Sequence, residues 1–332
     1  MGIFKFDEIA FNSTEKKKPV DEDKYTYLGL EHLDSDSIYV TRYGADVAPK
    51  GDKLIMKKGD VLFGKRRAYQ KKVAIAPFDG IFSAHGMVLR PKEDVIDKDF
   101  FPMFIKSDYF LDAAIKISVG SLSPTINWRD LKELKFELPS LEEQRKLAEV
   151  LWAIYDMKDK YKKLILATDE LVKSQFIEMF GDSNKYHKKQ ISDVAEVIAG
   201  GDRPKDISEV MTDEYRYPIY ANGIENEGLQ CYSKEFRVDK TAVTISARGT
   251  IGATFIRPPY FTPVVRLITV IPKAELNPVF LKYAIDYAEL ISNGSSQQQL
   301  TIPNVKKIEV VIPPVNKQNN YASFVVQSDK SK

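Results

Sequence analysis

The sequence predicts an α+β protein in which two mainly-β units are joined by a long, coiled-coil-like helix and followed by a second, shortened helix. Near the middle of the chain, about 40 residues without Pro or Gly follow helical spacing, which corresponds to roughly 60 Å of helix. The start of this helix recurs near the C-terminus, and short alternating runs precede both copies. We therefore expect a pseudo-two-fold internal repeat, with boundaries at residues 1–139, 140–181, 182–313 and 314–332.

The first unit, residues 1–139, has the pattern of short strands separated by turns. Alternating apolar and polar side chains predict strands at 72–75 and 87–89, and a short helix is expected at 99–106. Residues 59–77 read as two strands around a turn rich in Lys and Arg. This turn is the densest group of cations in the unit.

The central helix, residues 140–181, has recognisable ends and one apolar face. Ser140 can accept from the amide three residues later while Glu143 reaches back, which is a capping box, and Gly181 suits the position after the last turn. The apolar residues recur three and four apart, with a gap at Thr168, and are Leu147, Val150, Ile154, Met157, Tyr161, Leu164 and Leu171. A stripe of this length usually has a helical partner, so we predict a helix interface there; a long core helix is the alternative.

The second unit, residues 182–313, and the distal helix, residues 314–332, repeat this order. Gln144 matches Gln318 at an offset of 174 residues, and Pro139 matches Pro313 at the same offset. Strands are predicted at 242–245 and 267–271, and a helix at 278–290. The distal copy of the helix is much shorter than the central one, so we expect much of the central stripe to lack an intramolecular partner.

Composition narrows the class of protein. Lys and Arg number 49 against 47 Asp and Glu, so the net charge of +2 gives no chain-wide attraction to a polyanion, although local basic patches could bind one. Cys231 is the single cysteine, and the three histidines show no metal-ligand spacing. No apolar run approaches the ~18 residues of a membrane span, and no secretory signal is present. We expect a cytoplasmic protein without metal or membrane contact.

Three motifs suggest a family. They are Leu-Pro-x-Leu-x-Glu-Gln at 138–144, Tyr-Ala-Asn-Gly-Ile at 220–224 and Gly-Thr-Ile-Gly at 249–252. Together with the order of the parts, they resemble the specificity (S) subunit of Type I DNA restriction–modification enzymes over nearly the whole chain. No single motif carries the resemblance; the sequence of unit, helix, unit and helix start does.

The resemblance implies a fold, a function and partners. In that family two target recognition domains each read one half of a split DNA site, while two long helices space them and dock methyltransferase (M) subunits. It therefore implies a non-catalytic specificity subunit that binds double-stranded DNA, two M subunits and, through the complex, restriction (R) subunits. It implies no cofactor on this chain; S-adenosylmethionine, ATP and Mg are expected on the partner subunits. The shortened distal helix departs from the family pattern and leaves a homodimer open.

A chain that reads DNA needs cations for phosphates and forked or amide side chains for base edges. In the first unit we expect these contacts from the basic turn and from a polar loop at 120–125. The candidates are Lys65, Arg66, Arg67, Tyr69, Lys71, Lys72, Ser121 and Ser123. The alternative is a solvated basic turn beside a polar surface loop. His85 could read a base, and a structural role is equally compatible with its position.

In the second unit, the candidates lie at equivalent places. Arg248 occupies the turn that corresponds to the basic turn, and the amide-rich loop at 294–299 corresponds to 120–125. A Gln side chain can pair with adenine through two hydrogen bonds. The full set is Arg203, Lys205, Tyr220, Asn222, Arg248, Gln297, Gln298 and Gln299.

Two segments of the sequence resemble catalytic motifs but are incomplete. Arg257 begins an Arg-Pro-Pro-Tyr run similar to the Asx-Pro-Pro-Tyr of adenine methyltransferases, but its side chain cannot accept a hydrogen bond. Asp130, Glu133 and Lys135 imitate a nuclease motif, yet the alternation around Leu134 indicates a half-buried strand. We therefore expect no catalysis. The other class of function left open is an assembly protein that acts through the helical stripe, by dimerisation or by sequestering a partner.

Overall fold

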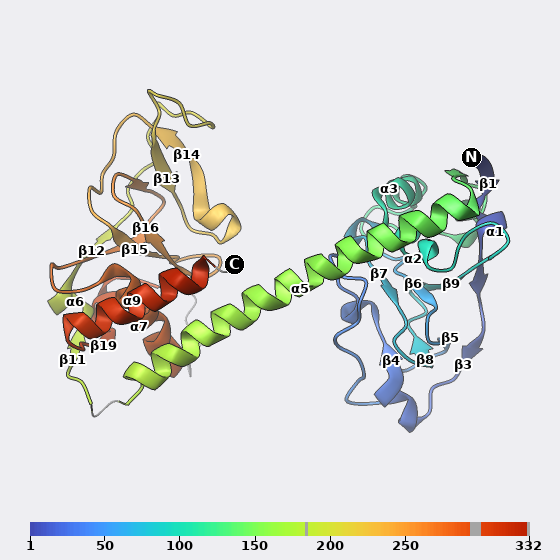
Figure 1. Cartoon of the computed structure of the whole chain (residues 1–332), viewed down its shortest axis with the longest axis horizontal. Helices are drawn as coiled ribbons and strands as arrows, with labels where there is room; N and C mark the ends of the chain where they lie inside the picture. The colour runs from blue at the N-terminus through green and yellow to red at the C-terminus, as the bar shows by residue number, and fades with distance from the viewer. Residues whose placement is uncertain (183–184, 293–299, 331–332) are drawn as a thin grey trace. The chain divides into compact units, whose positions relative to one another are not determined.

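The structure is a computed structural model that describes residues 1–182, 185–292 and 300–330. Contacts divide the chain into two compact units, unit 1 (Met1–Asp159) and unit 2 (Lys160–Lys332) (Figure 1). The long helix α5 (Leu141–Phe180) contributes its first half to unit 1 and its second half to unit 2. The predicted α+β class with two repeated units and a long central helix is confirmed.

Unit 1 begins with short strands and ends with helices. Its elements, with η for short 3-10 helices, are β1 (Gly2–Lys5), α1 (Phe6–Ile9), β2 (Ala10–Ser13), β3 (Lys16–Lys17), η1 (Asp21–Thr26), β4 (Tyr27–Leu28), η2 (Leu30–His32), β5 (Lys53–Met56), β6 (Val61–Phe63), η3 (Ala68–Gln70), β7 (Val73–Ile75), β8 (Gly80–Phe82), β9 (Met87–Pro91), α2 (Phe100–Lys106), α3 (Asp108–Lys116), α4 (Trp128–Leu131) and β10 (Lys135–Leu138).

The part of unit 2 that follows α5 has a similar succession of strands and helices. Its elements are β11 (Lys188–Gln190), α6 (Ile191–Val194), β12 (Ala195–Ala199), β13 (Tyr217–Tyr220), η4 (Glu225–Gly228), β14 (Leu229–Ser233), β15 (Ala242–Ile245), β16 (Thr254–Arg257), β17 (Thr262–Pro263), β18 (Ile268–Pro272), α7 (Pro278–Ser292), α8 (Ile302–Lys306), β19 (Glu309–Val311) and α9 (Val315–Asp329).

The internal repeat extends to the connectivity of the sheets. The four-stranded sheet β2-β9-β6-β7 of unit 1 has the same strand order as β12-β18-β15-β16 of unit 2. The strand before each long helix pairs antiparallel with the first strand of its unit, as β1-β10 and β11-β19. A parallel pair, β4 with β8 and β13 with β17, lies in the remaining sheet of each unit. The two units therefore share the topology of this four-stranded sheet, whereas their remaining sheets differ, with the order β3-β5-β8-β4 in unit 1 and β14-β13-β17 in unit 2.

Helix α5 begins with the capping box that the sequence predicts. The Ser140 amide donates to Oε2 of Glu143 at 3.0 Å, and the Glu143 amide donates to Oγ of Ser140 at 3.4 Å. Two of the free amides at the helix start are thereby satisfied. The helix ends at Phe180, one residue before Gly181.

One glutamine in each unit fastens the start of a long helix to a neighbouring loop. The buried Gln144 accepts from the Asp97 amide at 2.8 Å and donates to the carbonyl oxygens of Val95 at 3.1 Å and Pro139 at 3.0 Å. Gln318, also buried, accepts from the Asn277 amide at 2.9 Å and donates to Pro313 O at 2.9 Å and Glu275 O at 3.4 Å. The sequence match between these glutamines therefore reflects one shared anchoring arrangement.

Aromatic side chains dominate the core of unit 1. The Phe6 ring lies 5.0 Å from that of Phe110 and 6.0 Å from that of Phe136, measured between centroids. Ser107 divides the helical region here, because its hydroxyl donates to Phe104 O and accepts from the Phe110 amide. The helix predicted at 99–106 thus appears as α2, and α3 follows it without having been predicted.

The core of unit 2 includes the last turns of α5. Val172, Phe176 and Phe180 are buried, and the Phe176 ring lies 5.4 Å from that of Tyr321 on α9. The Tyr321 hydroxyl donates to the carbonyl of Val172 at 3.1 Å. The end of α5 and helix α9 therefore pack against each other within this unit.

Candidate nucleic-acid interface

In unit 1, two segments that the sequence analysis chose independently are in contact. The turn between β6 and β7 meets the loop at 120–125: the Arg67 amide donates to Pro124 O at 2.8 Å, and the Ile126 amide donates to Lys65 O at 2.9 Å. Arg66 forms an antiparallel bridge with Thr125, and Nε of Arg67 lies 3.5 Å from Oγ of Ser123. Guanidinium groups and hydroxyls predicted to contact DNA are therefore neighbours.

The loop before β9 joins this surface through His85. The Arg66 amide donates to His85 O at 3.3 Å, and Nη1 of Arg66 lies 3.4 Å from Nε2 of the imidazole. Burial, followed by the charges of Arg66, Lys65 and Lys53, holds the pKa of His85 below 6.5. This shift favours the neutral ring, which presents one donor and one acceptor.

The cations of the basic turn are not equally available. Lys71 makes ion pairs with Asp108 at 2.7 Å and Asp112 at 2.8 Å, and Lys72 donates to Leu30 O at 2.6 Å. Burial, with a contribution from Lys16, lowers the pKa of the partly buried Lys65. Lys71 and Lys72 are thus engaged by the protein and Lys65 is partly buried, so the DNA contacts of these three lysines stay predictions with less support.

The remaining candidates of unit 1 face solvent. Arg66, Arg67, Tyr69 and Ser121 are exposed, while Ser123 is half-buried. Arg67 has a φ of 54°, a left-handed conformation that is uncommon for a residue with a side chain. Two guanidiniums, one aromatic ring and hydroxyls are a suitable combination for phosphate and base contacts.

In unit 2, Asn222 holds the turn that carries Arg248. Its Oδ1 accepts from the Ala247 amide at 2.7 Å, and its Nδ2 donates to Val265 O at 2.8 Å. The amide group is thereby used within the protein, so Asn222 positions two loops. Arg248 is exposed and makes no hydrogen bond or ion pair with any residue that the structure describes.

Tyr220 is packed beneath a buried arginine. The guanidinium carbon of Arg257 lies 3.8 Å from the centre of its ring, and Nη1 of Arg257 pairs with Oε2 of Glu227 at 3.1 Å. Burial raises the pKa of Tyr220, and the charge of Arg257 opposes this rise. This cluster explains why Arg257, which only imitates a catalytic motif, is buried; a DNA contact by Tyr220 stays a prediction.

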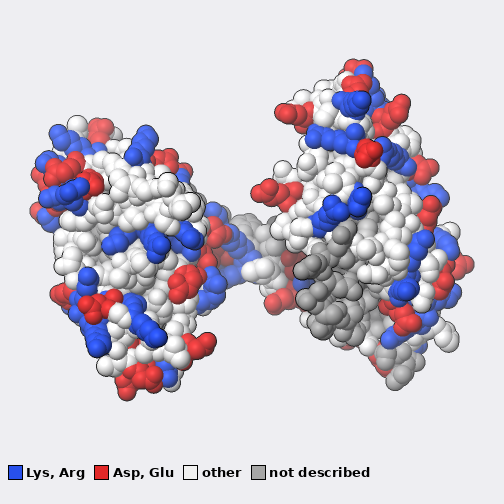
Figure 2. All heavy atoms as spheres, turned by 180° about the vertical axis from the view of Figure 1, so that it is seen from behind, with Lys and Arg blue, Asp and Glu red and all other residues white. Residues whose placement is uncertain are grey.

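The other candidates of unit 2 are less constrained. Arg203 is exposed with Nη2 at 3.3 Å from Sγ of Cys231, and Lys205 is exposed. Gln297, Gln298 and Gln299 lie outside the described residues. On the face drawn in Figure 2, Lys and Arg occur in small groups on both units with acidic residues between them. The cations of the described residues on that face form no continuous basic surface.

Arg266 is a further exposed arginine of unit 2 that was not among the residues predicted from the sequence. The pairing of β6 with β9 in unit 1 ends at Phe63 and Met87, and the pairing of β15 with β18 in unit 2 ends at Ile245 and Ile268. Counted outward from these pairs, Arg66 corresponds to Arg248 and His85 corresponds to Arg266. Arg266 lies two residues before β18, so an alignment of the repeat at this strand would have identified it.

The predicted stripe of α5 is exposed. Its seven side chains range from 44% exposed for Leu147 to 59% for Ile154 and Met157. Single exposed apolar residues are common, but a row of this length along one helix is typical of a surface that binds a partner. The alternative that this is a long core helix is therefore wrong for these seven residues. Val172 and Phe176, nearer the end of the helix, are buried.

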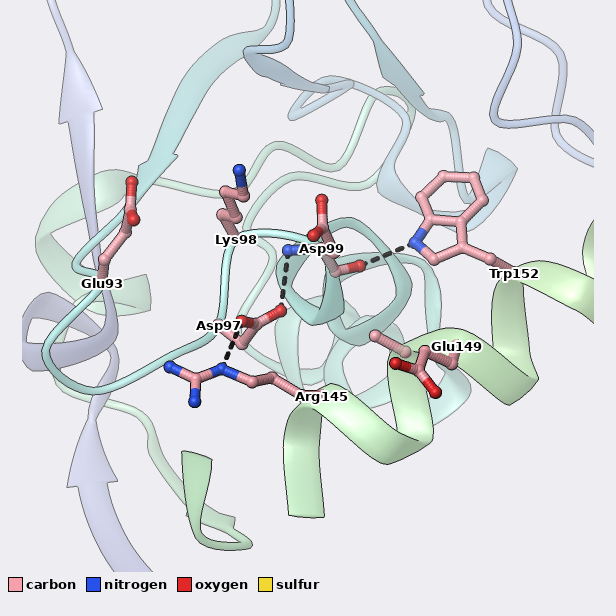
Figure 3. A pocket seen from close by; sticks show the side chains of 8 residues that line it. Glu93, Asp97, Lys98, Asp99, Arg145, Glu149 and Trp152 are labelled. Carbon is pink, nitrogen blue, oxygen red and sulfur yellow. Dashed lines mark hydrogen bonds and ion pairs between the residues drawn. The ribbon is translucent and has the colours of Figure 1, made fainter. Parts of the chain in front are cut away.

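A groove lies beside the start of α5 in unit 1 (Figure 3). Nε1 of Trp152 donates to Asp99 O at 2.8 Å, and Nε of Arg145 lies 3.4 Å from Oδ2 of Asp97. Glu93 and Glu149 add further carboxylates to the lining. A groove at the corresponding place in unit 2 is lined by uncharged residues and one lysine, namely Asn277, Val279, Asn319, Ala322, Ser323, Val326, Gln327 and Lys330.

Comparison with known proteins defines the family. A family model described as the Type I restriction modification DNA specificity domain matches residues 3–167 and 184–332. The chain belongs to the family of Type I restriction–modification specificity subunits, which are non-catalytic recognition subunits. The predicted resemblance is confirmed.

Individual relatives agree with this assignment. A putative type I specificity subunit of Mycoplasma pneumoniae is 28% identical over 252 residues, which cover 70% of this chain and 74% of the relative. Another from the same organism is 31% identical over 249 residues, covering 71% of this chain and 65% of that one. The EcoDI specificity subunit of Escherichia coli is 26% identical over 163 residues, covering 48% of this chain and 36% of the relative.

Two solved structures share the fold. The S subunit from M. genitalium superposes with a TM-score of 0.64 at 16% identity, covering 99% of this chain and 89% of that one. A chain from a study of complex assembly in the type I R-M system gives a TM-score of 0.51 at 17% identity, covering 99% and 90%. Both show the likeness of fold.

In the part of the chain that the structure describes, no group of three or more His, Cys, Asp or Glu side chains could hold a metal ion. No helix in this described part is long and apolar enough to span a bilayer.

Proposed function

We propose that this chain is the DNA-reading subunit of a Type I restriction–modification complex, in which unit 1 and unit 2 each recognise one half of a bipartite, asymmetric target in double-stranded DNA. The observation that carries the proposal is the pair of equivalent turns on two sheets of the same strand order. In unit 1 the turn presents Arg66 beside His85, and Arg248 and Arg266 occupy the corresponding positions of unit 2. The same scaffold with different side chains is what two different half-sites require.

Helix α5 suits the role of a spacer between the half-sites. It has 40 residues, and a helix of this length spans roughly 60 Å. The capping box fixes its start, and Val172, Phe176 and Phe180 fix its end in the core of unit 2. In the proposed function, α5 therefore acts as the spacer helix, and α9 packs against its end within unit 2.

The helices also supply surfaces for two methyltransferase subunits. The two grooves occupy equivalent positions of the repeat. Ala148 and Trp152 line the groove of unit 1, and the residues 174 positions later, Ala322 and Val326, line the groove of unit 2. Their equivalent positions favour two copies of one partner, although the linings differ in charge. Restriction subunits would join through that complex, and S-adenosylmethionine, ATP and Mg would be bound by the partners in a cytoplasmic assembly.

The exposed stripe of α5 favours a second role as an assembly surface. Isolated chains could pair through this stripe as a homodimer, or the stripe could sequester a partner without DNA. Analytical sedimentation of the chain alone and with its methyltransferase separates these functions. A stable homodimer that binds neither DNA nor methyltransferase would support the role as an assembly protein and contradict the role in DNA recognition.

Mapping of methylated adenines in cells that express this chain with its methyltransferase tests the proposed function. The expected result is one asymmetric motif of two specified parts separated by unspecified bases. Cells that express the methyltransferase without this chain are the control and should lack that motif. A methylation pattern that is identical in both cultures would overturn the proposal.

A further inference from the structure

Arg266 of unit 2 corresponds in position to His85 of unit 1, which lies next to Arg66 of the basic turn. In unit 1 the two positions are in contact, since Nη1 of Arg66 lies 3.4 Å from Nε2 of His85. In unit 2 the amide of Asn222 bridges the two loops, accepting from Ala247 N–H and donating to Val265 O. Arg248 and Arg266 each follow directly after one of these bridged residues.

The backbone around Arg266 is held firmly. The Val265 amide donates to Gly201 O at 2.9 Å, and the Arg266 amide donates to Gly200 O at 3.1 Å. The amide of Gly200 donates in return to Leu267 O at 2.8 Å. A side chain at Gly200 would bring its Cβ within 2.7 Å of the Val264 backbone nitrogen, so glycine is required for this close approach.

This held backbone adopts an unfavourable conformation. Val265 has a φ of 51° and Arg266 a φ of 60°, and the left-handed region is a clear outlier for a β-branched residue such as valine. Strain of this kind persists only where surrounding contacts impose it, and it is concentrated at sites that bind ligands. The hydrogen bonds to Gly200 and Gly201 supply those contacts.

The side chain of Arg266 is not used within the protein. It is exposed and makes no hydrogen bond or ion pair with the residues that the structure describes. The held backbone fixes the position from which the guanidinium is presented, so that only the side chain has to be ordered when the partner binds. Arginine pairs with O6 and N7 of guanine through two hydrogen bonds, which is the commonest specific contact in the major groove.

We propose that Arg266 is a specificity-determining residue of unit 2 that reads a guanine in the half-site of that unit. This inference rests on the proposed function. Unit 1 carries His85 at the equivalent position, and its neutral ring offers a single donor and a single acceptor. The two units therefore differ in chemistry at one structural position, which accounts for different half-sites read by one sheet topology.

The test uses the complete chain with its methyltransferase and a set of duplexes. The duplexes carry the mapped target and all single-base changes in the half-site of unit 2. We expect Arg266→Ala to lower affinity for the intact target by about 10- to 100-fold and to abolish discrimination at one G·C pair. Arg216→Ala is the matched control, because this exposed arginine of unit 2 donates to Asp213 O and lies on another loop. It should leave every base preference unchanged.

The outcomes separate the inference from the proposed function. Wild-type complex that binds no specific duplex would contradict the proposed function itself. Selective wild-type binding, combined with Arg266→Ala binding that is unchanged or weakened equally for every duplex, would overturn only the role of Arg266. Should Arg266→Ala fail to fold by circular dichroism, Arg266→Lys keeps the charge but loses the forked geometry. Reduced preference for guanine in that variant supports the inference, and unchanged preference contradicts it.

Discussion

Removal of Gln144 tests whether the repeated helix anchor stabilises the fold. Gln144→Ala deletes three hydrogen bonds, with the Asp97 amide and with the carbonyls of Val95 and Pro139. Each such bond contributes about 0.5–1.5 kcal/mol, and the buried groups left without partners add to the cost, so we expect a loss of about 2–4 kcal/mol. For a unit of this size, that loss lowers the midpoint of thermal unfolding by roughly 5–15 °C.

Scanning calorimetry of the complete chain measures this loss. Gln318→Ala should produce a similar loss, because Gln318 makes the same set of contacts in unit 2. Glu142→Ala is the control: Glu142 lies in the same helical turn as Gln144, but its ion pair with Lys146 is exposed and worth well under about 1 kcal/mol. A Gln144→Ala shift no larger than that of Glu142→Ala would refute the anchoring role.

Three further predictions concern DNA affinity, the stripe and pH. The double variant Arg66→Ala with Arg67→Ala should lower DNA affinity and reduce the slope of log K against log salt by about 2, measured by titration at 50–200 mM salt. Ile154→Glu should change the free energy of unfolding by less than about 0.5 kcal/mol, because the side chain is exposed, yet weaken copurification of the methyltransferase. The pKa of His32 lies below 6.5, chiefly through burial, and its Nδ1 accepts from the Gly29 amide. The unfolded chain therefore takes up this proton first, so stability is complete above pH 6.5 and declines as the pH falls toward the folded pKa; His32→Gln should flatten this dependence in pH-dependent melts.

Each of these predictions has a control or an opposing result. Arg42→Ala with Arg129→Ala removes two exposed arginines elsewhere in unit 1 and should leave the salt slope unchanged. Ala153→Glu adds the same charge beside the stripe and should not affect copurification; equal loss in both variants would argue against the stripe. Acid sensitivity that is identical in wild type and His32→Gln would assign the effect to other groups.

Local signals in the sequence were sufficient for the central helix and the repeat. The capping box at Ser140 and the equivalence of Gln144 and Gln318 involve neighbouring residues or a constant offset, so both could be predicted. The break that separates α2 from α3 depends on the hydroxyl of Ser107 and was not predicted. A single hydroxyl gives no periodic signal.

Availability of the candidate site residues could not be predicted, because it depends on distant partners. Lys71 belongs to the basic turn by sequence, but its charge is paired with Asp108 and Asp112 on α3. Tyr220 is covered by Arg257, which comes from another strand. Arg266 becomes visible only when the strand register aligns it with His85. Contacts between residues far apart in the chain decide all three cases.

Exchange of one unit tests the central claim, that two related units read different half-sites, most directly. Residues 1–139 are replaced by the corresponding unit of another family member whose methylation motif is known. Methylation is then mapped with the same methyltransferase. The account predicts that one half of the motif changes to that of the donor while the other half and its asymmetry persist. A motif altered in both halves, or altered in neither, would contradict it.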